Sequence, residues 1–144
     1  LSPVPVEIDI CPGEANGYFS SMENRIVLRP GMSQIQTVKT LVHEIAHAKL
    51  HDAKNIPPEE RKQRREKEVE AESIAYVVCQ HFGIDTSEYS FGYVAGWSRG
   101  KEMNELKSSL DQIHSTAGEI IAALDDTCMV HTQVKSKPTP QFAR

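Results

Sequence analysis

Two histidines one helical turn apart, with a glutamate beside the first, are the residues whose types and spacing point most directly to chemistry. They form the run His43-Glu44-Ile45-Ala46-His47, an H-E-x-x-H pattern. Side chains four residues apart lie on one face of a helix, so both imidazoles can bind one Zn²⁺ from the same side. Glu44 would then act as general base, taking a proton from a water molecule that attacks a carbonyl group.

The alternative is that His43, Glu44 and His47 are ordinary polar positions of an amphipathic helix. The residues between and before them are apolar, which places the histidines at a half-buried face of a strongly patterned helix. Metal binding gives polar side chains at such a face a purpose, and we therefore predict a zinc site here.

A catalytic zinc ion needs a third protein ligand and one open position. Glu68 and Glu72 are four residues apart, where a charged stretch becomes an apolar helix, and Glu70 points elsewhere. We assign Glu68 to the metal. Glu72 is predicted to accept a hydrogen bond from a ligand imidazole and so to set its tautomer. The alternative is that both are exposed carboxylates of a charged helix.

A peptidase also needs a donor that stabilises the oxyanion of the transition state. The sequence offers four candidates: Tyr76, Tyr89, Tyr93 and His81. Tyr76 follows Glu72 by four residues on the same face, and it is also a natural core residue. His51 could be mistaken for a metal ligand, but we expect it at the helix end, where its charge would suit the helix dipole.

The first part of the chain has the pattern of a small sheet. Apolar and acidic residues alternate over residues 4–10, and further short strands are predicted at residues 18–21 and 25–29. Their connections are too short for crossovers, so the sheet should be antiparallel or mixed. Helical periodicity follows and makes the fold class α+β.

Three helices are predicted after the sheet. The first runs from the N-cap Ser33 to about residue 51 and carries the H-E-x-x-H pattern. The second spans residues 59–82 and stops at Gly83. The third spans residues 93–124 and carries an apolar stripe that includes Leu110. The stripe favours core packing, with weak dimerisation as the alternative.

The length of 144 residues is typical of one domain. We expect a metallopeptidase domain at residues 1–126 and a flexible polar tail at residues 127–144. Because the chain begins at Leu1, we interpret it as a domain of a longer protein.

Composition excludes several classes of function. A net charge of −4 argues against a dedicated nucleic-acid binder, and the basic run at residues 61–67 is more typical of a solvated helix face. The three cysteines form no C-x-x-C pair, which fits a reducing, cytoplasmic setting. The sequence has no apolar run long enough to span a bilayer.

These motifs resemble the ImmA/IrrE-type metallopeptidases and the metallopeptidase domain of ArdC-type antirestriction proteins from mobile elements. The resemblance covers roughly residues 25–79, and it implies a zincin-like α+β fold with Glu68 as third zinc ligand. Glu72 departs from the asparagine usual in the ImmA/IrrE branch and is closer to the ArdC branch. The strand Ile26-Val27-Leu28 would be the edge strand along which a substrate peptide lies.

The resulting hypothesis is a cytoplasmic zinc metallopeptidase that hydrolyses a protein or peptide substrate, acting as a monomer or weak dimer. The resemblance implies a DNA-binding partner domain in the full-length protein. The alternative is a metal-bound regulatory or antirestriction module that binds a protein or DNA partner without cutting it.

Overall fold

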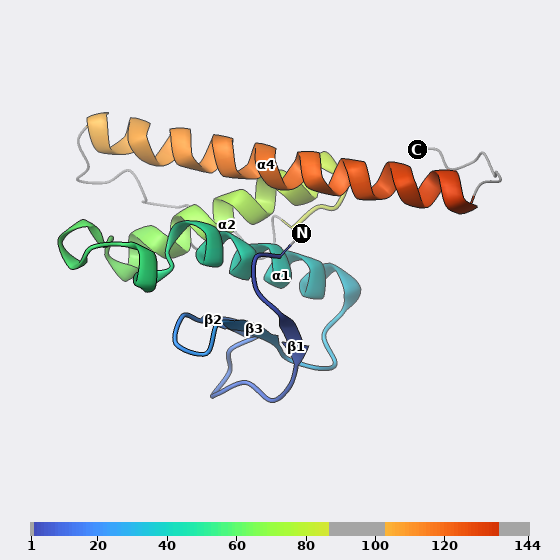
Figure 1. Cartoon of the computed structure of the whole chain (residues 1–144), viewed down its shortest axis with the longest axis horizontal. Helices are drawn as coiled ribbons and strands as arrows, with labels where there is room; N and C mark the ends of the chain where they lie inside the picture. The colour runs from blue at the N-terminus through green and yellow to red at the C-terminus, as the bar shows by residue number, and fades with distance from the viewer. Residues whose placement is uncertain (1, 87–102, 136–144) are drawn as a thin grey trace.

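A three-stranded sheet lies beneath one layer of helix and is followed by two more helices (Figure 1). The computed structural model describes residues 2–86 and 103–135 of the chain. The strands are β1 (Val6–Ile8), β2 (Gly17–Ser20) and β3 (Arg25–Leu28), in the spatial order β1-β3-β2. β1 is parallel to β3 and β2 is antiparallel to it, so the predicted mixed sheet is confirmed.

The strand containing Ile26, Val27 and Leu28 is the centre of the sheet, not its edge. β2 and β3 form a hairpin, and β1 then pairs with the other side of β3. The prediction of an edge strand at this position is therefore wrong. The reason is that an apolar run such as Ile26-Val27-Leu28 indicates burial of the strand's faces, and both Ile26 and Val27 are fully buried. It does not indicate whether one or both edges of the strand pair with neighbouring strands.

The helices are α1 (Gln34–Leu50), α2 (Arg64–His81) and α4 (Met103–Lys135). α1 packs on the sheet, α2 packs on α1, and α4 packs on α2 (Figure 1). One apolar core joins these layers. Its members are Ile26, Leu28, Val42, Ile45, Ala46, Ala71, Ile74, Ala75, Val78, Ile113, Ala117 and Ile120. None of the described helices has the length and apolar character needed to cross a membrane.

α1 begins and ends where the sequence predicts. The Ser33 hydroxyl accepts a hydrogen bond from the backbone N–H of Gln36 at 3.1 Å, which satisfies one of the donors left open at a helix start. His51 is the C-cap residue, and its backbone N–H donates to the carbonyl of His47. The H-E-x-x-H pattern therefore lies in the C-terminal half of a well-capped helix.

α2 begins later than predicted, at Arg64 rather than near Glu59. Pro58–Glu60 forms one 3-10 turn, after which Arg61 adopts an extended backbone. The Arg61 guanidinium donates to the carbonyls of Ala53 and Ile56, which holds this segment against the preceding loop instead of continuing a helix. The predicted end is confirmed, because Gly83 follows the helix with a φ of +79°.

α4 extends past the predicted end near residue 124 to Lys135, and it continues through the expected boundary at residue 126. Residues 93–102 of the predicted helix and residues 136–144 of the predicted tail lie outside the described residues. The apolar stripe is confirmed at Ile113, Ala117 and Ile120, but Leu110 is 51% exposed. At this turn of α4 it is Ser109, and not Leu110, that is buried against α2, where its Oγ donates to Glu70.

Candidate metal centre

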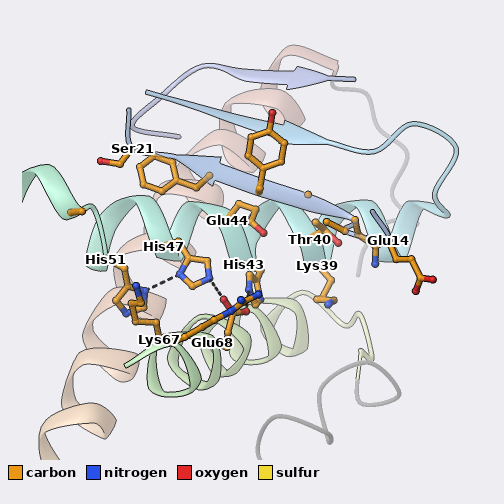
Figure 2. A pocket seen from close by; sticks show the side chains of 17 residues that line it. Glu14, Ser21, Lys39, Thr40, His43, Glu44, His47, His51, Lys67 and Glu68 are labelled. Carbon is orange, nitrogen blue, oxygen red and sulfur yellow. Dashed lines mark hydrogen bonds and ion pairs between the residues drawn. The ribbon is translucent and has the colours of Figure 1, made fainter. Parts of the chain in front are cut away.

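α1 carries the H-E-x-x-H pattern between the sheet and α2. The apolar residues of α1 pack into the core and fix the position of the helix. His43 and Glu44 are therefore buried, and His47 is half-buried. Figure 2 shows His43 and His47 on the side of α1 that faces α2, and Glu44 on the side that faces the sheet. One helix thus directs two imidazoles toward α2 and one carboxylate toward the sheet.

Glu68 of α2 meets both histidines. Its Oε1 lies 3.1 Å from Nε2 of His43, and its Oε2 lies 3.1 Å from Nε2 of His47. One ligand atom from each of these residues lies within 4.8 Å of the other two. The structure therefore brings together the three side chains that the sequence assigns to the metal.

The donor set fits a zinc ion. Two imidazole nitrogens and one carboxylate oxygen are the protein ligands of one large class of catalytic zinc sites, which keep a fourth position open. The side chain of Glu68 is 27% exposed and faces a cleft, so a fourth position can be reached from solvent. His43, His47 and Glu68 would hold the ion.

In the metal-free protein, hydrogen bonds between the histidines and the glutamates of this cluster offset the cost of burying their charges. Burial opposes ionisation of Glu68, but its hydrogen bonds with His43 and His47 outweigh this and lower the pKa of the carboxyl group. Burial likewise opposes the charged form of His43, and the hydrogen bonds with Glu68 and Glu72 raise its pKa to about 9. A bound cation would take over the role of these protons.

Glu72 lies behind His43, as predicted. Its side chain is fully buried, and its Oε1 accepts a hydrogen bond from Nδ1 of His43 at 2.6 Å. A carboxylate at this nitrogen keeps the proton on Nδ1 and directs Nε2 toward Glu68. The alternative of an exposed carboxylate is excluded for Glu72.

A cleft of about 650 Å³ opens beside these ligands, between α1, the start of α2 and β2. Glu44, His43 and His47 line it (Figure 2). Burial raises the pKa of Glu44, and the nearby histidines partly oppose that rise. A carboxylate with a raised pKa is better suited to accept a proton from water near neutral pH.

The sequence matches a known family over most of this region. Residues 12–93 match the IrrE N-terminal-like domain, a peptidase family, and this span includes all three candidate ligands. The chain belongs to this family. It is also 36% identical over 107 residues to an uncharacterized protein of Bacillus anthracis, covering 70% of this chain and 17% of that protein. No solved structure matches the chain.

The candidate oxyanion donors are less well placed in this IrrE-like domain. Tyr76 is half-buried and does not line the cleft, and His81 pairs with Asp125 at 3.4 Å near the surface. Tyr89 and Tyr93 lie outside the described residues. The role of Tyr76 stays a prediction, and Tyr18 of β2 is a phenol that does line the cleft.

Two features of the IrrE-like site escape sequence reasoning. Lys39, one turn before His43, is buried with its Nζ 3.3 Å from Glu72. His51 and Glu70 form a second buried pair beside His47. The sequence features that could have indicated them are the four-residue spacings from Lys39 to His43 and from His47 to His51, which place these side chains on one face of α1. His51 lies at the end of α1, as predicted, and is its C-cap residue. Burial lowers its pKa, which opposes the charged form that would suit the helix dipole.

Gly17 allows β2 to approach α1 closely enough to form the wall of the cleft. A Cβ atom at this position would lie 2.8 Å from Cγ2 of Thr40 and 3.0 Å from the carbonyl oxygen of Val27. We expect Gly17→Ala to lower the free energy of unfolding by about 1–3 kcal/mol, because overpacking forces the backbone to move. Urea unfolding of the metal-free protein measures this.

Gly118→Ala is the matched control, because a Cβ atom there would meet no heavy atom within 4 Å. It lies inside α4, where alanine is the better helix former by up to about 1 kcal/mol. We therefore expect this variant to be as stable as wild type or more so. Equal stability of Gly17→Ala and wild type would contradict the close packing of β2.

Proposed function

We propose that this chain is the catalytic domain of a zinc metallopeptidase that hydrolyses a peptide bond of a cytosolic protein. The observation that carries the proposal is the convergence of Nε2 of His43, Nε2 of His47 and the Glu68 carboxylate beside a cleft lined by Glu44. Membership of a peptidase family supports it.

The chemistry can be divided among these side chains. A zinc ion held by the three ligands supplies a Lewis acid that polarises a carbonyl group and lowers the pKa of water. Glu44 accepts the proton of the water that attacks the substrate carbonyl, and it then donates this proton to the leaving amine. Glu72 keeps Nε2 of His43 directed at the ligand cluster.

The substrate peptide is proposed to lie along β2 rather than β3. Gly17, Tyr18 and Phe19 line the cleft, and β2 is an edge strand whose outer side does not pair with another described strand. An extended peptide can add to such an edge through backbone hydrogen bonds. The carbonyl groups of such a peptide would then lie near α1, which contacts β2.

The proposed peptidase would act as one part of a longer protein. The chain spans 17% of the length of the Bacillus anthracis relative that it matches. We propose that other regions select the target and that a DNA-binding domain is among them. Binding of DNA by the basic run at residues 61–67 has less support, because Arg61 and Lys62 are engaged with other parts of this chain.

Elemental analysis of protein purified without chelator tests the proposal. We expect about one zinc ion per chain, as a site with three protein ligands requires. Removing the ion should lower the melting temperature, since zinc at 1,000 times its Kd stabilises the folded state by about 4 kcal/mol. Absence of bound zinc, even after zinc is added back, would exclude the proposed function.

A further inference from the structure

His51 connects the metal ligand His47 to a buried carboxylate of α2. Nδ1 of His47 lies 2.9 Å from Nδ1 of His51, and Nε2 of His51 lies 2.8 Å from Oε1 of Glu70. The side chain of His51 is 5% exposed and that of Glu70 is fully buried. A continuous chain of hydrogen bonds therefore leads from the metal cluster into the core.

The direction of these hydrogen bonds follows from the chemistry of the groups. An ionised carboxylate only accepts, so Nε2 of His51 donates its proton to Glu70. The Nδ1 atom of a neutral His51 then carries no proton and must accept the proton on Nδ1 of His47. This arrangement keeps a proton on Nδ1 of His47, so Nε2, which faces Glu68, is the ring nitrogen left for a metal ion, which would replace the proton that Nε2 shares with Glu68.

Glu70 is itself held by two other parts of the chain. Nζ of Lys62, from the segment before α2, and Oγ of Ser109, from α4, both donate to its Oε2, the latter at 2.7 Å. Lys62 also contacts Gln112 of α4 at 2.6 Å. Burial opposes ionisation of Glu70, but the hydrogen bonds from His51, Lys62 and Ser109 lower its pKa.

We propose that His51 and Glu70 position His47 for zinc, as Glu72 does for His43, and that Ser109 makes zinc affinity depend on α4. The proposal rests on the zinc site proposed above. Each ligand imidazole then has an acceptor behind it, one supplied directly by α2 and one through a second histidine. Neither His51 nor Glu70 belongs to the ligand cluster, so both are positioning residues.

Zinc affinity of the whole chain, measured by competition with a chromophoric chelator, tests this inference. His51→Phe keeps a ring but removes the acceptor, and we expect the Kd for zinc to rise about 10- to 100-fold. His51→Asn places an amide oxygen close to the position of Nδ1, and it should restore most of the affinity. Circular dichroism of each metal-free variant shows that the comparison is between folded proteins.

Ser109→Ala provides a variant remote from the metal, with Ser108→Ala as its matched control. Ser109 is buried against Glu70, whereas its neighbour Ser108 is exposed on the same helix. We expect Ser109→Ala to weaken zinc binding several-fold and Ser108→Ala to leave it unchanged. If His51→Phe does not fold, Glu70→Gln takes its place, since it keeps the shape of the buried side chain but not its charge.

A purely structural role for His51 is distinguished by the His47→Ala background. Positioning acts through His47, so His51→Phe should cause no further loss of zinc affinity once His47 is absent. A loss of the same size in both backgrounds would overturn the inference. Wild-type affinity for zinc in both His51→Phe and Glu70→Gln would also overturn the inference, while leaving the proposed zinc site intact. A wild-type chain that binds no zinc would overturn both the proposed zinc site and the positioning role of His51 and Glu70.

Discussion

Replacing Glu44 with glutamine is expected to slow peptide hydrolysis severely while leaving zinc bound. Glu44 lines the cleft beside the ligands but is not one of them, and glutamine keeps its shape without its ability to accept a proton. General-base catalysis contributes about 10²- to 10⁴-fold to the rate of such reactions. We expect kcat/KM to fall by that factor, with the zinc content unchanged.

A library of random peptides, with cleavage followed by mass spectrometry, serves as the substrate for this comparison. Glu60→Gln is the control, because Glu60 is an exposed carboxylate in a 3-10 turn outside the cleft. It should cleave the same peptides at the wild-type rate. Undiminished cleavage by Glu44→Gln would rule out the mechanism proposed for this carboxylate.

The same variant separates a peptidase from a regulatory module that binds its partner without cutting it. A module of that kind would retain its biological effect after Glu44→Gln, because the ligands and the fold remain in place. A peptidase would lose the effect together with hydrolysis. The two functions therefore predict opposite outcomes for one substitution.

Replacing Glu68 with alanine is expected to remove both zinc and hydrolysis. Its two oxygens each lie 3.1 Å from a ligand nitrogen, so no other side chain of the described cluster can take its place. Structural zinc sites with four ligands contribute about 10–16 kcal/mol. Divided over four ligands, this is on the order of 3 kcal/mol for each ligand, and we expect zinc binding to weaken about 100-fold or more when one is removed.

Elemental analysis beside Glu60→Ala checks this prediction. The control removes a glutamate of the same loop-helix region that has no part in the cluster, so its zinc content should equal that of wild type. If Glu68→Ala retained the wild-type zinc affinity, the third ligand would have to be another residue. Loss of zinc in both variants would indicate a general effect on folding.

The sequence by itself determined the local parts of this protein. A repeat of four residues on one helix requires only the helical period, so His43 and His47 could be assigned to one face without knowledge of the fold. The Ser33 cap and the Gly83 stop likewise depend on neighbouring backbone groups alone. The spacing of Glu68 and Glu72 predicted that both would face the same side, and both contact His43.

Only the tertiary structure decided which separate elements meet. β3 became the central strand because β1 pairs with its free side, and the order of strands in space is not written in their alternation. Glu70 was expected to point away from the site, and it does lie on another face of α2. It nevertheless reaches the site through His51, because the C-terminal end of α1 packs where Lys62 and Ser109 also converge. Hydrogen bonds between residues so distant in sequence depend on the packing of three elements, which no local pattern contains.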